Sequence, residues 1–165
     1  MNDAYAEWLV KRKTPAINHV LKVAIIVVLV FSILLAMMNL AGIILMTVVG
    51  IAAYFVIPQL NLEFEYLVVN DQITIDKVMG RSKRKKAWEG NLEQIQVIAP
   101  VDAYQVKDYD RVQGLKVLDF TSHQPGARVY GIIHQDGSST TKVLFEPNDK
   151  ILNVLRQKGP RKVLL

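Results

Sequence analysis

The sequence contains no cysteine, so it offers neither a disulfide framework nor a thiolate metal site. From Val23 to Ile57 it also has no Asp, Glu, Lys, Arg or His, a run of 35 residues. An uncharged apolar run of this length is typical of a membrane protein, and not of a soluble domain or a disordered chain. The 165 residues leave about one small domain after this run, which excludes a large multidomain enzyme.

The uncharged run predicts two transmembrane helices. One straight helix over its whole length would be about 52 Å long, whereas the hydrocarbon layer is about 30 Å thick. Asn39 and Gly42 fall near the middle of the run and can turn the backbone there. We therefore predict a transmembrane hairpin over residues 20–57, with spans at Val20–Met38 and Ala41–Ile57. A hairpin that enters one leaflet and returns is the alternative, although each arm is long enough to cross.

Positive residues lie on both sides of this hairpin and are absent from its turn, which predicts that both termini are cytoplasmic. The cations before it or near its start are Lys11, Arg12, Lys13 and Lys22, and those after it include Lys77, Arg81, Lys83, Arg84, Lys85 and Lys86. A cleaved signal peptide is the rival interpretation, but no small-x-small cleavage site follows the first span. We expect a protein of the cell membrane with two spans.

Beyond Lys22 at its start, the hairpin contains no ionisable side chain, so transport by this hairpin alone is not expected. Small residues offer surfaces for close helix contact, either between the two arms or with another chain in a homo-oligomer. These residues are Ser32, Ala36, Thr47, Gly50 and Ala53.

Residues 1–19 are predicted to form an interfacial amphipathic segment, with a short helix from Asp3 to Lys13 that Pro15 ends. Its aromatic side chains would enter the headgroup boundary while its cations meet anionic lipid. The residues expected at the membrane surface here are Trp8, Lys11, Arg12 and Lys13. The same cations also suit an ordinary positive-inside flank.

After Pro58 the pattern becomes an alternation of apolar and polar residues, which is typical of β-strands. We predict a domain over residues 59–165, with strands near 62–68, 73–75, 81–88, 92–98, 115–121, 128–134 and 140–145. Residues 101–114 are polar and are expected to form a long loop or a short irregular helix.

A helix is predicted after Glu146-Pro147-Asn148-Asp149, with proline in its first turn and an end at Gly159-Pro160. Its apolar stripe consists of Ile151, Leu152 and Leu155. The fold class is thus a membrane α-helical hairpin plus a mainly-β domain of about seven antiparallel strands and a C-terminal helix. We expect a curved, partly closed sheet whose open end is covered by that helix.

Two segments carry a resemblance to a known family: residues 65–75 (EYLVVNDQITI) after two spans, and Phe145-Glu146-Pro147 before the helix. With these features the chain resembles bacterial membrane-anchored pleckstrin-homology-like (PH-like) proteins, and is most similar to small uncharacterised families with a two-helix anchor. The resemblance implies a PH-like fold and a tethered binding or scaffolding module without catalytic residues. It does not extend to phosphoinositide binding, because the first hairpin turns through Asn70-Asp71 and the cations come later.

The basic run after residue 80 consists of Arg81, Lys83, Arg84, Lys85 and Lys86. Each cation near an anionic leaflet contributes about 1 kcal/mol of attraction, so this run predicts contact with anionic lipid headgroups. A solvated hairpin that only sets topology is the competing interpretation. A nucleic-acid partner is not expected, because residues 59–165 carry 16 Lys and Arg against 13 Asp and Glu.

No constellation for catalysis or metal binding is evident, since His19, His123 and His134 lack ligand spacing. We therefore predict no cofactor and no enzymatic activity. The tail from Lys158 is expected to be disordered. The predicted function is a membrane-anchored binding or scaffolding module whose free sheet edge or hairpin contacts a protein partner. The alternative is an accessory subunit of a transporter or other membrane complex.

Overall fold

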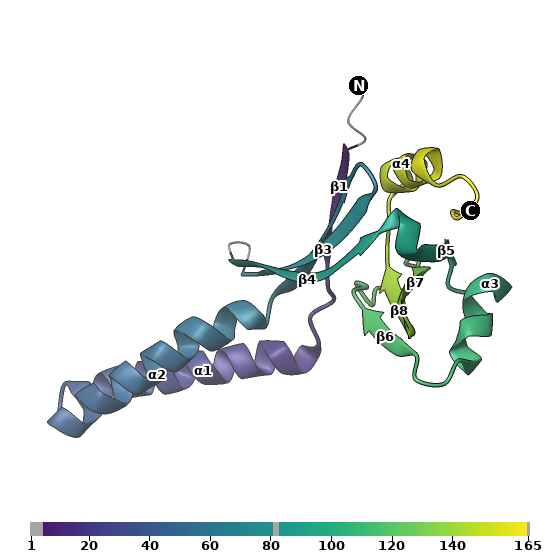
Figure 1. The fold of residues 1–165 in the computed structure, drawn as a ribbon. Helices are drawn as coiled ribbons and strands as arrows, with labels where there is room; N and C mark the ends of the chain where they lie inside the picture. The colour runs from purple at the N-terminus through teal and green to yellow at the C-terminus, as the bar shows by residue number, and fades with distance from the viewer. Residues whose placement is uncertain (1–4, 81–82, 165) are drawn as a thin grey trace. The chain divides into compact units, whose positions relative to one another are not determined.

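The computed structural model describes residues 5–80 and 83–164, which form two compact units. One unit contains residues 13–62 and 78–83, and therefore both long helices. The other contains the remaining residues and all of the second β-sheet. Figure 1 labels most of the helices and strands of both units.

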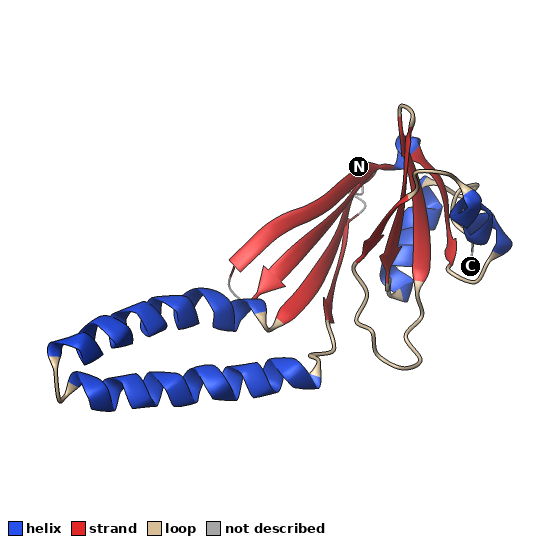
Figure 2. Cartoon of the chain, turned by 90° about the horizontal axis from the view of Figure 1, so that it is seen from below, coloured by secondary structure: helices blue, strands red, loops and turns tan. Residues whose placement is uncertain are grey.

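Two antiparallel helices, α1 (Ala16–Ala36) and α2 (Leu40–Gln59), make up most of the first unit (Figure 2). The predicted reversal at Asn39 is confirmed: its side chain caps α2 by accepting the Gly42 amide at 2.8 Å. Both helices are long and apolar enough to cross a membrane. α1 begins before its predicted span, with Pro15 as its cap, and ends at Ala36, short of the predicted Met38. α2 extends beyond its predicted span and continues through Pro58.

Small residues lie where the two helices meet. Ser32 of α1 and Gly42 and Ala53 of α2 are buried, whereas most large apolar side chains of both helices are exposed. A Cβ atom at Gly42 would lie 2.2 Å from the Leu35 carbonyl carbon, so glycine is required for this close approach. A Cβ atom at Gly50 would meet no atom within 4 Å, so this glycine lies on an open face.

The first sheet has the order β1-β2-β3-β4. Its strands are β1 (Tyr5–Lys11), β2 (Leu62–Val69), β3 (Gln72–Met79) and β4 (Lys83–Asn91). β1 precedes the helices and β2 follows them, yet they pair antiparallel from Tyr5 opposite Val69 to Lys11 opposite Glu63.

The predicted interfacial helix over Asp3–Lys13 is therefore wrong over Tyr5–Lys11, and Asp3 lies outside the described residues. The physical reason is the alternation in this segment. Ala6 and Val10 are buried, and Trp8 lies opposite Tyr66 of β2. Residues 5–11 thus belong with the β-strands, and the predicted boundary between a 1–19 segment and a 59–165 domain does not hold.

The second sheet has the order β5-β7-β8-β6. Its strands are β5 (Ile95–Pro100), β7 (Tyr130–Asp136), β8 (Ser139–Phe145) and β6 (Lys116–Asp119). The prediction of one sheet of seven antiparallel strands needs correction, because β1 adds a strand, two sheets form, and β6 runs parallel to β8. The short helix η1 (Leu92–Gln94) precedes β5, so the strand predicted from residue 92 begins only at Ile95. For residues 101–114 the prediction is a long loop or a short irregular helix, and the structure has two short helices there, α3 (Tyr104–Lys107) and η2 (Asp108–Arg111).

The core forms between the two sheets around Tyr66, which is fully buried. Its ring packs edge-on against Phe145, with centroids 5.6 Å apart, and its hydroxyl donates to the Phe120 carbonyl at 2.6 Å. The Glu146 amide donates to the same hydroxyl at 3.3 Å. Burial raises the pKa of Tyr66 well above its ordinary value. Helix α4 (Asp149–Lys158) buries Ile151, Leu152 and Leu155 and lies beside β1 (Figure 1).

Two details at the C-terminal end differ from prediction. Pro147 lies just before the α4 cap, Asn148, and not in the first turn, because the Asn148 side chain accepts the Ile151 amide at 2.9 Å. The tail is ordered through Leu164: the Ile98 amide donates to the Lys162 carbonyl at 2.7 Å, and the Leu164 amide donates to the Ile98 carbonyl at 2.8 Å. The tail covers the edge of β5 and buries Val163, which explains why the prediction of disorder fails.

Candidate membrane-surface site

Gly80, which follows β3, contacts the C-terminal end of α2. The Gly80 amide donates to the Asn61 carbonyl at 3.2 Å, and Gly80 has a φ of +58°. A Cβ atom at this position would lie 2.9 Å from the Pro58 Cβ. Glycine is therefore required here by both its backbone conformation and the available space.

Lys83 lies over the aromatic side chains at this end of α2. Its Nζ atom is 4.5 Å from the Tyr54 ring centroid and 5.5 Å from that of Phe55. The two rings pack edge-on with their centroids 5.3 Å apart, and both are more than half exposed. Lys83 and the two rings thus form a cation–π cluster at this end of α2.

The other members of the predicted basic run differ in their contacts. Arg84 forms a 3.1 Å ion pair with Glu65, and Lys86 forms an ion pair with Glu89. Lys85 is exposed and has no ion-pair partner among the described residues, whereas Arg81 lies outside them. The cations of the basic run therefore differ: Arg84 and Lys86 are paired with carboxylates, whereas Lys85 is not paired among the described residues.

Glu65 explains why Arg84 points to the sheet. Its side chain is only 8% exposed, whereas that of Arg84 is 65% exposed. Burial raises the pKa of Glu65, Glu7 on the neighbouring strand raises it further, and the Arg84 guanidinium opposes both. Arg84 thus compensates a carboxylate that β2 holds away from water.

The cations before α1 do not share one role either. The Arg12 guanidinium lies over the Phe64 ring, 5.8 Å from its centroid, and 3.2 Å from His123 Nε2. Lys11 is the last residue of β1, and Lys13 is exposed. Trp8 lies on β1 and is 42% exposed, so it is a strand residue and not part of an interfacial helix.

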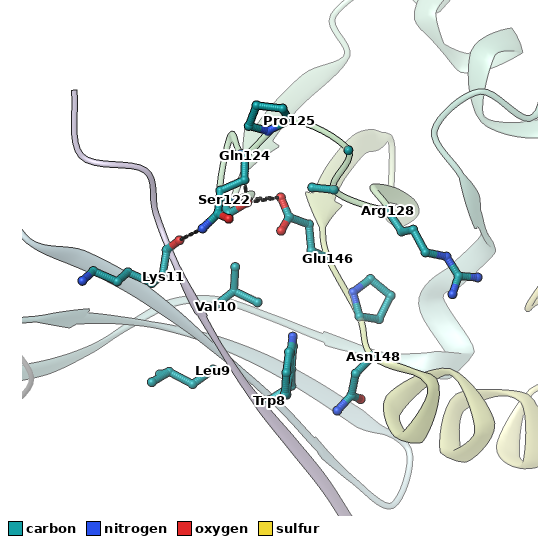
Figure 3. Close-up of a pocket in the computed structure, with 13 residues that line it drawn as sticks. Trp8, Leu9, Val10, Lys11, Ser122, Gln124, Pro125, Arg128, Glu146 and Asn148 are labelled. Atoms are coloured by element: carbon teal, nitrogen blue, oxygen red, sulfur yellow. Dashed lines mark hydrogen bonds between the residues drawn. The ribbon is translucent and has the colours of Figure 1, made fainter. Parts of the chain in front are cut away.

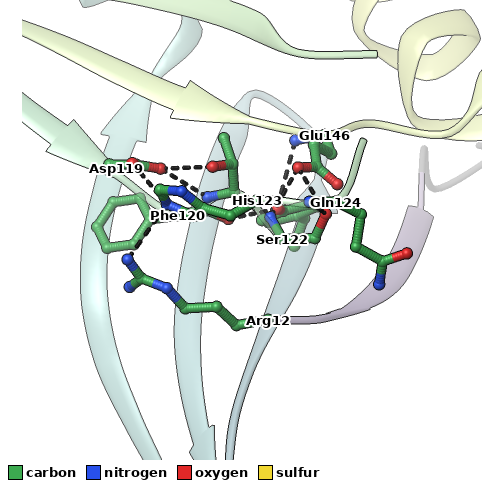
Figure 4. A network of polar contacts seen from close by, with 9 residues as sticks. Arg12, Asp119, Phe120, Ser122, His123, Gln124 and Glu146 are labelled. Carbon is green, nitrogen blue, oxygen red and sulfur yellow. Dashed lines mark hydrogen bonds and ion pairs between the residues drawn. The ribbon is translucent and has the colours of Figure 1, made fainter. Parts of the chain in front are cut away.

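A polar network holds the loop after β6 against the end of β1 (Figure 4). His123 Nε2 is 2.9 Å from Asp119 Oδ2, while the Thr121 amide and hydroxyl donate to Asp119 Oδ1 at 2.9 and 2.7 Å. Burial favours the neutral form of Asp119, but the Thr121 hydrogen bonds, with the charges of His123 and Arg12, hold its pKa below the ordinary value. Sequence reasoning missed this network, because its members lie on separate segments.

A groove of about 450 Å³ lies next to this network, between β1 and the β8–α4 corner (Figure 3). Its lining includes Trp8, Lys11, Ser122, Arg128 and Glu146. Of the residues predicted at the membrane surface, Trp8 and Lys11 thus line a groove of the β unit, while Lys83 contacts the end of α2.

A family model described as a bacterial PH-like domain (DUF6106) matches residues 2–165. The chain belongs to this family. The match covers nearly the whole sequence, and it confirms the resemblance to bacterial PH-like proteins. Searches of curated proteins and of solved structures found no significant match.

Two long apolar helices near the N-terminus and a β-sheet domain with a C-terminal helix are consistent with a PH-like fold, and β1, which precedes the helices, completes the first sheet. PH-like domains are generally non-catalytic. Within residues 5–80 and 83–164, no group of three or more His, Cys, Asp or Glu side chains is arranged to hold a metal ion. The two candidate binding surfaces in this PH-like protein are the basic residues from Lys83 onward and the groove beside β1.

Proposed function

We propose that this protein is a membrane-anchored, non-catalytic binding or scaffolding module that presents its PH-like domain at the cytoplasmic face of the membrane. The observation that supports it best is the pairing of β1 with β2. One strand precedes α1 and the other follows α2, so the sheet forms only if the chain leaves the helix pair on the side from which it entered. This requirement favours two full spans and termini in one compartment.

The flanking charges support the cytoplasm as that compartment. Lys and Arg lie on both sides of the helix pair, and the turn at Met37–Asn39 has none. By the positive-inside rule the shared side is the cytoplasm.

Contact with anionic headgroups is the second part of the proposal. Lys83 lies beside Tyr54 and Phe55 at the end of α2, a position that corresponds to the headgroup region if α2 spans the membrane. Lys85 follows two residues later and is exposed. Each such cation is expected to contribute about 1 kcal/mol near an anionic leaflet, while Arg84 and Lys86 contribute less because carboxylates already pair with them.

Single-cysteine labelling tests the topology, because the natural chain has no cysteine. The variants are Met38→Cys in the turn between the helices, Lys13→Cys before α1, and Ser139→Cys at the β7–β8 turn. In intact cells a membrane-impermeant maleimide should label only the Met38→Cys variant, and permeabilisation should make the other two reactive. Labelling of Lys13→Cys and Ser139→Cys from opposite sides would contradict the proposal.

Hydrogen exchange tests the lipid contact in full-length protein reconstituted into nanodiscs. Amides of residues 78–86 should exchange more slowly in phosphatidylglycerol-containing nanodiscs than in pure phosphatidylcholine, and high salt should remove the difference. The double variant Lys83→Ser/Lys85→Ser should abolish it. Lys107→Ser/Lys116→Ser, which changes two exposed cations elsewhere, is the matched control. Equal exchange in both lipids would rule out the contact.

The accessory-subunit role has one supporting observation. Thr47 is exposed, and Gly50 has open space at its Cβ position, so α2 has a small-residue face that α1 does not cover. A larger membrane complex would be disrupted by Gly50→Leu, which native gel electrophoresis of solubilised membranes detects as faster migration. Unchanged migration would exclude this face as the contact.

A further inference from the structure

Strand β1 has an open edge. Within the part of the chain that the structure describes, β2 is its one hydrogen-bonded neighbour in the sheet. The Gln124 side-chain amide donates to the Lys11 carbonyl at 3.4 Å, so that carbonyl points away from β2. Because backbone groups alternate along a strand, the amide and carbonyl of Leu9 and of Glu7 point to the same side.

The other edges in this unit are protected in ways that β1 is not. The tail residues Lys162–Leu164 cover β5, cations occupy the start of β4, and β6 has only four residues. The centre of β1 is Trp8-Leu9-Val10, and the side chains of Trp8 and Leu9 are 42% and 47% exposed. An apolar edge of seven residues without a covering strand is suited to pairing with another chain.

The groove of about 450 Å³ lies along this edge (Figure 3). Its opposite wall is formed by the loop from Ser122 to Arg128 and the corner from Glu146 to Asn148. The Ser122 amide and hydroxyl donate to Glu146 at 2.7 and 3.0 Å, and the Gln124 amide donates to the Ser122 hydroxyl at 3.0 Å. The wall is therefore held in place by hydrogen bonds, as expected for a preformed site.

The charges at the groove select the chemistry of its occupant. Lys11 and Arg128 are exposed cations on its rim, and Arg128 has only a 3.4 Å ion pair with Asp149, which is itself 84% exposed. A pair this exposed is weak and can be exchanged for another carboxylate. Of the residues that line the groove, Lys11 and Arg128 are cations and Glu146, which Ser122 holds in the wall, is the one carboxylate, so the lining carries a net positive charge.

We infer that this groove binds an extended segment of a partner protein that adds to β1 as a further strand. Acidic side chains of the segment pair with Lys11 and Arg128, and apolar side chains pack against Trp8. The inference deepens the proposed binding role by naming its surface and the chemistry of the partner. It does not depend on membrane topology, so its failure and that of the proposed anchor are distinguishable.

The test uses the full chain in nanodiscs and a displayed library of random seven-residue peptides as the probe. Enriched peptides are expected to combine Asp or Glu with aliphatic or aromatic residues in alternation. One enriched peptide is then synthesised, and its affinity is measured by fluorescence anisotropy. The double variant Lys11→Glu/Arg128→Glu should weaken binding about tenfold, with stronger loss at low salt, while the matched control Lys116→Glu should leave it unchanged.

Two further measurements examine the strand pairing itself. Leu9→Pro removes an amide that points away from β2, so the β1–β2 ladder should survive while peptide binding is lost. Independently of that variant, N-methylation of the peptide at alternate residues should abolish binding in one of the two registers. Absence of enrichment, retention of affinity in Lys11→Glu/Arg128→Glu, or tolerance of both N-methylated series would overturn the inference. A dimer that Leu9→Pro converts to a monomer would also overturn it, because the edge would then pair with a second copy.

Discussion

Lys11 and Glu63 lie opposite each other across β1 and β2, although both membrane-length helices stand between them in the sequence. The β unit is therefore completed by residues from both sides of the helix pair. This relationship has consequences for stability that are independent of any ligand.

Removal of β1 should destabilise the PH-like domain. A fragment of residues 59–165 lacks the strand that covers β2, so the apolar partners of Ala6 and Val10 become exposed and β2 becomes a free edge. We expect a lower melting temperature and aggregation. The control joins residues 1–12 to residues 62–165 through a short Gly-Ser linker, which should fold as a soluble protein with restored melting temperature. Equal stability of the two would contradict the role of β1.

Gly42 should be far less tolerant of substitution than Gly50. A Cβ atom at Gly42 would lie 2.2 to 2.4 Å from backbone atoms of Leu35 and Ala36, whereas one at Gly50 meets open space. We expect Gly42→Ala to cost about 1–3 kcal/mol of unfolding free energy or more, through forced separation of the helices. The measurement is thermal unfolding of the full chain in detergent. Gly50→Ala is the matched control and should be nearly neutral; similar losses in both would disprove the close contact.

Substitutions of Arg84 and Lys85 should differ in their effect on the unfolding free energy, because only Arg84 pairs with a buried carboxylate. Arg84→Met leaves the buried Glu65 without its partner and should destabilise the protein by about 1 kcal/mol at neutral pH. Lys85→Met removes an exposed charge and should leave the unfolding free energy unchanged. Urea titration of both variants checks the difference, and the double variant Glu65→Gln/Arg84→Met should recover most of the loss.

The Asp119 carboxylate should make the folding stability depend on pH in the acidic range. Its pKa is lowered in the folded protein from the ordinary 3.8, so its charged form stabilises the fold above that pH and the contribution is lost as the pH falls further. Asp119→Asn should therefore lower the melting temperature at pH 7, and the difference from wild type should shrink below about pH 4. Asp136→Asn, at the exposed end of β7, serves as the control. A difference that stays constant across this range would show that the carboxylate charge is not involved.

Several helices and strands could be predicted from local sequence patterns. The apolar run broke at Asn39 as predicted, because one side chain and a tight turn suffice to end one helix and cap the next. Alternation from Leu62 onward identified β2, and the Ile151, Leu152 and Leu155 stripe identified α4. These features depend only on residues close together in the chain.

Other elements could not be predicted in this way. Residues 5–11 carry aromatic and basic residues that suit an interfacial helix, and only pairing with β2 makes them a strand. The tail likewise becomes ordered because it covers β5. Of the predicted membrane-surface residues, Lys83 has contacts that support that role, whereas Arg84 and Arg12 contact Glu65 and His123.

The sequence by itself determined the two apolar helices, the change to β-strand periodicity and the basic run, because hydrophobic period and charge are local properties of the chain. Tertiary structure alone decided that β1 joins β2 across the helix pair, that carboxylates engage part of the basic run, and that a groove lies beside the β1 edge. Those outcomes depend on contacts between residues far apart in sequence, and a strand or an ion pair has no stable form until its partner is present.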